Sequence, residues 1–428
     1  MARIVMKFGG TSVANLDRIR HVAGLVAGEA AAGNEVAVVV SAMSGETNKL
    51  VGFVDALSGD GPEADAGAEA GSSEVLGGPI EDEYDAIVAT GEQVTSGLLA
   101  IALRRRGIAA RSWLGWQIPL KTDMAHSVAR IENITPDNLD SSMKDGNVAV
   151  VAGFQGLSED NRISTLGRGG SDTSAVALAV ALEADRCDIY TDVDGIYTTD
   201  PRIAEQAKRL DRISFEEMLE LASLGAKVLQ TRSVELAMNN NLPIRVLTSM
   251  AEAGVANPGT LVCHEDDTME ERVVSGVAYS RDEAQITLLR LEDKPGTVAK
   301  VCGVMSEANI IVDMIVQGRS RSDNAANLTF TVGKRDLARA LAALENASES
   351  IGFEDIKSDS DVTKVSIVGV GMRSHTGVAK TMFDALAERN INIEVIATSE
   401  IKISVLIDSE YTELAVRALH NAFELENV

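Results

Sequence analysis

The sequence predicts an α/β fold with a mainly parallel sheet, followed by two smaller units that repeat one β-α-β-β-α-β pattern. In the first part of the chain, short continuous apolar runs alternate with amphipathic helical stretches, as in strands buried between two layers of helices. In the last part, one arrangement of strand, glycine turn and helix occurs twice. These two observations carry the prediction of the fold class.

The chain begins with two buried strands separated by a helix. The first strand is Arg3–Phe8, and the pair Gly9 and Gly10 follows it directly. Apolar side chains at helical spacing predict a helix from about residue 15 to residue 32. The second strand, Glu35–Val40, is almost entirely apolar, so it is expected to lie beside the first in the interior of the sheet.

The same alternation continues to a turn near residue 260. A helical pattern covers residues 81–106 and is interrupted near Gly91, and further strands are expected at 147–154, 186–191 and 244–247. The turn at Asn257–Thr260 contains Pro-Gly and ends the pattern. We therefore expect one catalytic-type α/β domain over residues 1–262.

Residues 58–78 differ in composition from their surroundings. They consist largely of Gly, Ala, Glu, Asp and Ser, with little hydrophobicity and a surplus of negative charge. A segment of this composition cannot bury enough apolar surface to order itself. We expect a loop or a partly disordered insert here.

The repeat occupies the last part of the chain. A strand at 285–291 is followed by a turn at Asp293–Gly296 and a helix, and a strand at 364–370 is followed by a turn at His375–Gly377 and a helix. Each unit is predicted to be ferredoxin-like. We expect the first unit, with its linker, at 263–360 and the second at 361–428, and two such units side by side are more typical of a small-ligand sensor than of a second catalytic domain.

Composition narrows the class of protein. The formal charge of −25 argues against nucleic acid and against anionic membrane as partners. We find no apolar run of membrane-spanning length and no signal-peptide profile at the start, so a soluble cytoplasmic protein is expected. The few cysteines and histidines are scattered without paired motifs, which predicts reduced thiols and no dedicated metal site. They are Cys187, Cys263, Cys302, His21, His126, His264, His375 and His420.

The segment from Gly167 to Asp172 has the features of an anion site. Its glycines allow positive φ and close approach of backbone N–H groups, and Ser171 and Asp172 open a long apolar helix. A helix N-terminus attracts anions, and Arg168 adds a planar fork of donors suited to a carboxylate or phosphate. The glycines alone are also typical of a plain strand–helix turn with a surface arginine. Other segments of the sequence must therefore distinguish an anion site from such a turn.

Lys7 supplies a second cation at the carboxyl end of a strand. Neither the P-loop nor the dinucleotide fingerprint is present, so phosphate must be bound by another geometry. A lysine in an apolar strand is costly unless an anion meets it, although a snorkelling edge lysine is the alternative. Open α/β sheets bind ligands at this edge.

A second loop of the same kind follows the strand at 186–191. Its Asp192-Val193-Asp194-Gly195 run lacks the spacing and terminal Glu of a calcium loop. A loop that faces a nucleotide, with Arg202 and Lys227 as cations, fits better.

Six motifs in order resemble the aspartate kinase family, which has the amino-acid kinase fold and paired C-terminal ACT domains. Each motif alone is modest, but the ordered set is highly specific to this family, and the resemblance spans nearly the whole chain. The motifs are Lys7–Val13, Ser41–Met43 with Thr47, Gly91-Glu92, Gly167–Asp172, Thr191–Gly195 and Phe215–Ala222.

The resemblance implies transfer of the γ-phosphoryl group from ATP with Mg²⁺ to the β-carboxylate of L-aspartate. The product is 4-phospho-L-aspartate, the first step toward lysine, threonine and methionine. Lys7 would stabilise the transferring phosphoryl group, and Asp172 would organise the lysine and the metal-bound phosphate. Catalysis of this kind is mainly alignment and charge stabilisation.

The resemblance also assigns the binding residues. Arg168 would clamp an aspartate carboxylate and Glu92 would meet its ammonium group. The remaining substrate positions are Ser41, Thr47, Gly169, Gly170 and Ser171, and the ATP positions are Lys7, Phe8, Gly9, Gly10, Thr191, Asp192, Tyr197, Arg202 and Lys227. Ordinary strand-end packing is the alternative for Ser41, Thr47 and Tyr197.

Two other functions remain open. Sister enzymes phosphorylate acetylglutamate, glutamate, carbamate or UMP, but Glu92 favours a substrate with a free ammonium group. A pseudo-kinase that only senses amino acids would be expected to lack Lys7, Glu92, Arg168 and Asp172, all of which are present.

The ACT-like pair implies feedback by lysine or threonine, with effector contacts at matching positions. One position departs, because the first unit reads Asn309-Ile310-Ile311 where relatives commonly have a second Asn, and isoleucine offers no polar group. Met269 is a possible internal start, so we expect a homo-oligomer or a complex with a shorter subunit. The expected effector residues are Asp293, Gln317, Asn392, Ser399 and Glu400.

Overall fold

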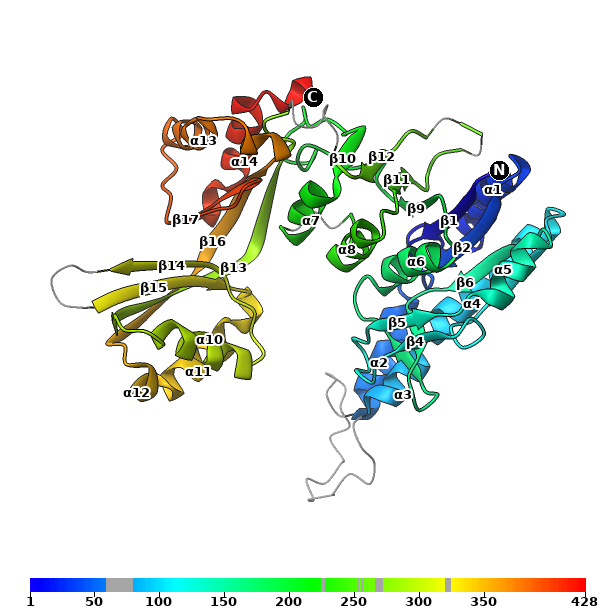
Figure 1. Ribbon diagram of the computed structural model, residues 1–428, viewed down its shortest axis with the longest axis horizontal. Helices are drawn as coiled ribbons and strands as arrows, with labels where there is room; N and C mark the ends of the chain where they lie inside the picture. The colour runs from blue at the N-terminus through cyan, green and yellow to red at the C-terminus, as the bar shows by residue number, and fades with distance from the viewer. Residues whose placement is uncertain (59–79, 225–227, 253, 256, 266–271, 320–324) are drawn as a thin grey trace, which may run out of the picture. The chain divides into compact units, whose positions relative to one another are not determined.

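In the computed structural model the chain forms two compact units (Figure 1). The first comprises Met1–Ile196, Arg209–Leu219 and Lys227–His264, and the second comprises Tyr197–Lys208, Glu220–Ala226 and Glu265–Val428. The structure describes residues 1–58, 80–224, 228–252, 254–255, 257–265, 272–319 and 325–428. The predicted acidic insert at 58–78 lies, from residue 59 on, outside this set.

An eight-stranded sheet forms the centre of the first unit, in the order β10-β12-β11-β9-β1-β2-β6-β3. All neighbours are parallel except β11 and β12, which are antiparallel. The central strands are apolar on both faces because helices cover both, as the continuous apolar runs predict. The strands are β1 (Arg3–Phe8), β2 (Glu35–Val40), β3 (Ala110–Trp113), β6 (Val148–Ala152), β9 (Arg186–Thr191), β10 (Arg212–Ser214), β11 (Ile244–Thr248) and β12 (Thr260–Cys263).

The helices of this unit begin where the sequence places capping groups and glycine turns. Asn15 caps α1, and its side chain accepts a hydrogen bond from the Arg18 backbone N–H at 3.0 Å. The helical pattern at 81–106 is divided at Ala89 into α3 and α4, close to the predicted interruption. The helices are α1 (Leu16–Ala31), α2 (Glu46–Ser58), α3 (Glu81–Val88), α4 (Thr90–Arg105), α5 (Asp137–Lys144), α6 (Gly170–Ala181), α7 (Phe215–Ser223) and α8 (Thr231–Asn239).

A second, four-stranded sheet in this unit was not predicted. Its order is β5-β4-β7-β8, and none of its strands exceeds four residues. Runs this short carry no readable alternation, so the sequence pattern cannot distinguish them from loops. They are β4 (Leu120–Thr122), β5 (Ile131–Ile134), β7 (Gln155–Leu157) and β8 (Ile163–Thr165).

One helical stretch in the described part of the chain is long and apolar enough to cross a membrane, which corrects the expectation that no run reaches that length. It is Glu81–Arg105, with a mean hydropathy of 1.4 over its most apolar window, and half of that window is buried inside the protein. Core helices of globular proteins meet the same criterion of length and composition, so this stretch is weak evidence for a membrane span.

The second unit contains a six-stranded antiparallel sheet in the order β14-β15-β13-β16-β18-β17. The strands are β13 (Gly276–Glu292), β14 (Asp313–Arg319), β15 (Ala325–Val332), β16 (Asp355–Val368), β17 (Val395–Thr398) and β18 (Lys402–Asp408). The helices are α10 (Thr297–Glu307), α11 (Leu337–Asn346), α12 (Ser348–Ile351), α13 (Val378–Ala387) and α14 (Thr412–Ala422).

The predicted repeat is confirmed, down to the backbone conformation of its turns. Gly296 and Gly377 precede α10 and α13 with φ of 95° and 92°, and Asn309 and Asn390 both have φ of 55°. Positive φ is tolerated best by Gly and next by Asn, which explains why these residue types recur at matching positions.

The second repeat takes its fourth strand from the chain that precedes the first repeat. No strand follows α14 in the described part of the chain, and Gly276–Ser280 of β13 pairs with Lys364–Val368 of β16 instead. Val277 lies in the same hydrophobic core as Val365. The long strands β13 and β16 therefore belong to both repeats, whereas the sequence pattern predicts two contiguous units. The boundary near residue 360 falls inside β16 and stays a proposal.

Candidate active site

A cavity of about 620 Å³ lies in the first unit at the carboxyl ends of β1 and β2. Its lining comes from the chain after each of these strands, from the start of α4 and from the glycine-rich segment that begins α6. All seven residues predicted to bind the amino-acid substrate line this one cavity. They are Ser41, Thr47, Glu92, Arg168, Gly169, Gly170 and Ser171.

Lys7 and Asp172 form an ion pair in the wall of this cavity. Lys7 lies in β1 between Val39 of β2 and Ile189 of β9, and its Nζ is 2.5 Å from Oδ1 of Asp172 in the first turn of α6. The side chains are 12% and 11% exposed, so each charge compensates the other away from bulk water. The ammonium group keeps donors for a further anion.

The glycines before α6 are required by space as well as by backbone conformation. Gly169 caps the helix with φ of 73°, and a Cβ there would lie 1.8 Å from Cγ of Gln230. A Cβ on Gly170 would lie 2.8 Å from Cδ2 of Phe154. The N-terminus of α6 therefore faces the cavity with bare backbone, the arrangement that favours an anion.

Glu92 presents a carboxylate with one unpaired oxygen. Its Oε1 accepts a hydrogen bond from the Ala42 backbone N–H at 2.9 Å, while Oε2 is buried without a hydrogen-bond partner in the described part of the chain. The residue is 3% exposed, and burial raises its pKa to about 7. Gly91 permits this packing, because a Cβ there would lie 2.7 Å from that of Ala42. A cationic group in the cavity would satisfy the unpaired oxygen.

Arg168 is exposed, lines the cavity and follows Gly167, which has φ of 71°. Within the described residues, no acidic side chain forms an ion pair with it. Its guanidinium group is therefore available for a carboxylate that enters the cavity.

The predicted nucleotide residues are only partly brought together. Lys7 and Gly10 line the cavity, with Gly9 between them in sequence. The Phe8 side chain is fully buried and stacks on Tyr190 with ring centroids 4.6 Å apart, so it supports the core and can offer a ligand only its backbone.

The remaining nucleotide positions lie elsewhere. Thr191 ends β9, the strand next to β1, and Asp192 follows directly after the strand. Tyr197 and Arg202 belong to the second unit, where the Arg202 side chain is 87% exposed and pairs with Asp200. Lys227 lies outside the described residues. The nucleotide role of this group stays a prediction.

Part of the cavity wall is not predicted by the sequence. Ser127 and Val128 come from the connection between β4 and β5, Tyr84 from α3 and Thr165 from the end of β8. Ser127 has φ of 66°, which is uncommon for a residue other than Gly, Asn or Asp. Nothing in the local sequence marks this conformation.

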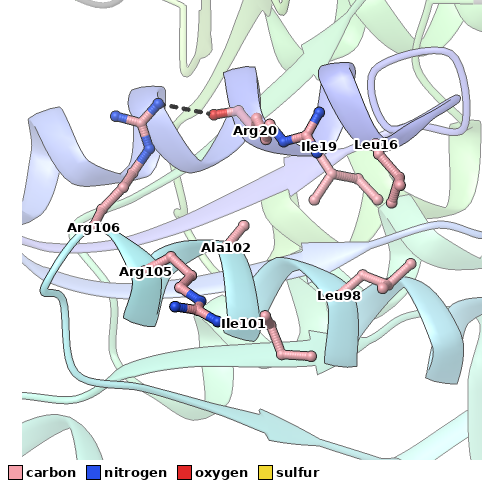
Figure 2. Close-up of a pocket in the computed structure, with 8 residues that line it drawn as sticks. All are labelled: Leu16, Ile19, Arg20, Leu98, Ile101, Ala102, Arg105 and Arg106. Carbon is pink, nitrogen blue, oxygen red and sulfur yellow. Dashed lines mark hydrogen bonds between the residues drawn. The ribbon is translucent and has the colours of Figure 1, made fainter.

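A separate surface hollow of about 480 Å³ lies between α1 and α4 (Figure 2). Its floor is apolar, with Ile19 and Leu98, and Arg20, Arg105 and Arg106 flank it; Arg106 donates a hydrogen bond to the Arg20 carbonyl at 3.1 Å. It contains no carboxylate and no glycine-rich helix start. The carboxylates and the glycine-rich helix start that suit an amino acid and a phosphate therefore line the cavity that contains Lys7.

Comparisons with known proteins identify the domains of the chain and its relatives. A family model described as the amino acid kinase family matches residues 2–248, and two models described as ACT domain match residues 286–349 and 365–423. An aspartate kinase of Pseudomonas fluorescens is 52% identical over 427 residues, covering 100% of this chain and 98% of that protein. An aspartokinase of Mycolicibacterium smegmatis is 44% identical over 429 residues, covering 99% and 97%.

The chain belongs to the aspartate kinase family.

Solved structures of the family have the same fold. E. coli aspartokinase III in complex with aspartate and ADP, called its R-state, aligns with a TM-score of 0.77 at 29% identity, covering 98% of this chain and 99% of that one. The same E. coli enzyme with lysine and aspartate, called its T-state, aligns with a TM-score of 0.74 at 28% identity, covering the same shares. The predicted architecture of an amino acid kinase domain followed by two ACT domains is thus confirmed.

Proposed function

We propose that this chain transfers the γ-phosphoryl group of ATP to the β-carboxylate of L-aspartate and releases 4-phospho-L-aspartate and ADP. The supporting observation is one cavity with four charged groups in complementary positions: the Lys7–Asp172 pair, the unpaired oxygen of Glu92 and the free guanidinium group of Arg168. Membership in the aspartate kinase family supports the same reaction.

The four groups divide between the two substrates. Arg168 receives a carboxylate of aspartate through two parallel N–H···O bonds, and Glu92 pairs with the ammonium group. Lys7 stabilises negative charge on the transferring phosphoryl group, and the N-terminus of α6 faces the same region. A carboxylate is already a nucleophile, so the residues align it and neutralise charge without needing a strong base.

Mg²⁺ is proposed to enter with the nucleotide. In the described part of the chain no group of three or more His, Cys, Asp or Glu side chains could hold a metal ion. Mg²⁺ bound to ATP needs only one or two protein carboxylates, since phosphate oxygens and water supply the other ligands. Asp172 fits this requirement, because its carboxylate lies in the cavity wall beside Lys7. The metal would neutralise phosphate charge there.

A coupled assay of ADP release tests the proposed function. The purified chain is incubated with MgATP and, in turn, L-aspartate, L-glutamate or N-acetylglutamate. Release that depends on aspartate supports the proposal. Release with another acceptor would identify a sister kinase, and no release with any acceptor would favour an amino-acid sensor without catalysis.

Aspartate affinity is expected to rise with pH up to about 7 and then to level off. Burial raises the pKa of Glu92 to about 7, so at lower pH the side chain must release its proton before it can pair with an ammonium group. Each pH unit below this pKa should weaken binding about tenfold. The KM for aspartate between about pH 5.5 and pH 8.5, with MgATP saturating, measures this dependence.

Two variants test whether the pH dependence of aspartate affinity comes from Glu92 or from a general effect of pH. Glu92→Gln should bind aspartate weakly at every pH, with the slope removed. Glu217→Gln is the matched control, because Glu217 is 1% exposed, accepts a hydrogen bond from the Ser214 backbone N–H at 3.1 Å and lies outside the cavity. An unchanged slope in Glu92→Gln would contradict the assignment.

Feedback by an end-product amino acid is proposed for the second unit. Gln317 lies on the edge strand β14, and Asn392, Ser399 and Glu400 flank the opposite edge strand β17; all are exposed. Met314 of β14 shares a small hydrophobic cluster with Val395 of β17, which links the two edges, and Asp293 is part of the turn before α10. The T-state structure of the E. coli enzyme, which contains lysine, supports an effector of this kind.

Titration of lysine and threonine, separately and together, into the kinase assay tests the proposed feedback. Inhibition by either supports it, and activity unchanged in every combination would contradict it. Ile311 is 85% exposed and offers no polar group, so the first repeat is proposed to bind an effector weakly or not at all.

Met269, the possible internal start, lies outside the described residues. We propose that the assembly is a homo-oligomer or a complex with a shorter subunit, and that it is cytoplasmic. Measuring the intact masses of the chains in the native enzyme would reveal a short subunit.

A further inference from the structure

Asp85 of α3 is a fully buried carboxylate that holds two separate segments of the cavity wall. Its oxygens accept hydrogen bonds from the Thr165 backbone N–H at 2.9 Å, the Thr165 hydroxyl at 2.5 Å and the Ser127 backbone N–H at 3.0 and 3.1 Å. His126 Nδ1 lies 2.8 Å from Oδ2, and within the described residues it is the only ion-pair partner of Asp85. Most of the compensation for this buried charge comes from donors on the cavity wall.

Both segments that Asp85 binds line the cavity. Ser127 has φ of 66°, a conformation that costs free energy in a residue with a side chain, so an outside contact must hold it. Its carbonyl oxygen would lie 3.1 Å from a Cβ on Gly167, and Ala129 donates a backbone hydrogen bond to the Thr165 carbonyl at 2.9 Å. The connection containing Ser127 and the strand end containing Thr165 are thereby fixed against each other.

The next helix along the chain carries Glu92, which is proposed to meet the ammonium group of the substrate. Asp85 is near the end of α3, and Glu92 is in the first turn of α4 after a break at Ala89. Arg168 follows Thr165 closely, beyond Gly167. These two consecutive helices therefore present Glu92 and, through Asp85 and Thr165, anchor the segment that carries Arg168.

We infer that Asp85 is a positioning residue for the amino-acid substrate: it sets the separation between Glu92 and Arg168 without touching substrate. The inference rests on the proposed function of this cavity. Lys7 lies on β1 and, within the described residues, forms its ion pair with Asp172 and none with Asp85, so the phosphoryl side of the site should depend little on Asp85.

Asp85→Asn tests this role with almost no change in volume. An amide has one acceptor oxygen, and its NH₂ group would face backbone N–H donors that need an acceptor. We expect the KM for aspartate to rise about tenfold or more, the size of a lost hydrogen bond to a charged group. The kcat and the KM for MgATP should stay within about threefold of wild type.

Thr165→Val provides a second route if Asp85→Asn folds poorly, because it removes only the hydroxyl donor at the same site. It should raise the KM for aspartate in the same direction by a smaller factor, and the double variant should be no worse than Asp85→Asn alone. The control is Asp188→Asn, since Asp188 is 1% exposed, pairs with Arg186 at 3.0 Å and lies outside the cavity lining. It should leave the KM for aspartate unchanged.

The outcomes separate this inference from the proposed function. Wild-type enzyme without aspartate-dependent ADP release would contradict the function itself. With active wild type, a native KM for aspartate in both variants, or equal rises in KM for aspartate and for MgATP, would overturn the positioning role.

Discussion

Lys7→Ala is expected to lower kcat about a thousandfold while changing the KM for aspartate little. The lysine pairs with Asp172 in the cavity wall at 2.5 Å, and its remaining donors face the region where the α6 N-terminus favours anions. The ammonium group of Lys7 stabilises the negative charge that develops during transfer more than it stabilises ground-state ATP. The buried cavity wall contains little water, so this interaction is only weakly screened. Single-turnover and steady-state ADP release would both measure the loss.

The alanine variant also leaves Asp172 buried without its partner, so folding must be checked independently. Lys7→Met with Asp172→Asn replaces the ion pair by a neutral pair of similar volume, which is often tolerated in a protein interior. We expect this double variant to unfold near the wild-type temperature and to be as inactive as Lys7→Ala. Lys49→Ala, at an exposed lysine that pairs with Glu46 on α2, should retain activity. A large rise in the KM for aspartate, with kcat preserved, would reverse the roles assigned to Lys7 and Arg168.

The parts of this site that the sequence predicts are those in which residue type and backbone geometry coincide. Gly169 must have positive φ and no Cβ, and Asp172 lies in the first turn of an apolar helix. Lys7 stands out because a charge in an apolar strand requires a partner, and the structure provides Asp172. Such features depend on a few neighbouring residues, so they can be read along the chain.

The parts that the sequence does not predict depend on contacts between distant segments. Asp85 looks like an ordinary helical acid until the fold brings Thr165 and Ser127 to it. The start of β13 looks like a linker to the first repeat, yet it completes the sheet of the second because β16 offers it a free edge. In both cases the deciding partner lies far along the chain, and no local pattern records which partner will be met.

Arg168→Ala is expected to raise the KM for aspartate about a hundredfold with little change in kcat. Its guanidinium group lies in the cavity lining without an acidic partner in the described residues, so a substrate carboxylate would be its main anionic contact. Loss of a bidentate pair removes two charge-assisted hydrogen bonds, and the carboxylate of bound aspartate is left to water. Because these bonds hold the substrate equally before and during transfer, their loss affects KM rather than turnover.

Arg168→Lys separates charge from geometry, because lysine keeps the positive charge but not the planar fork. We expect it to recover only part of the affinity that alanine loses. Arg111→Ala is the control, since that guanidinium group lies 4.1 Å from the centre of the Trp113 ring and outside the cavity. Full recovery by lysine would show that charge alone is recognised, and a KM for aspartate unchanged in Arg168→Ala would remove Arg168 from the substrate site. In that event Glu92, with its unpaired oxygen, would be left as the main group that distinguishes aspartate from acids without an ammonium group.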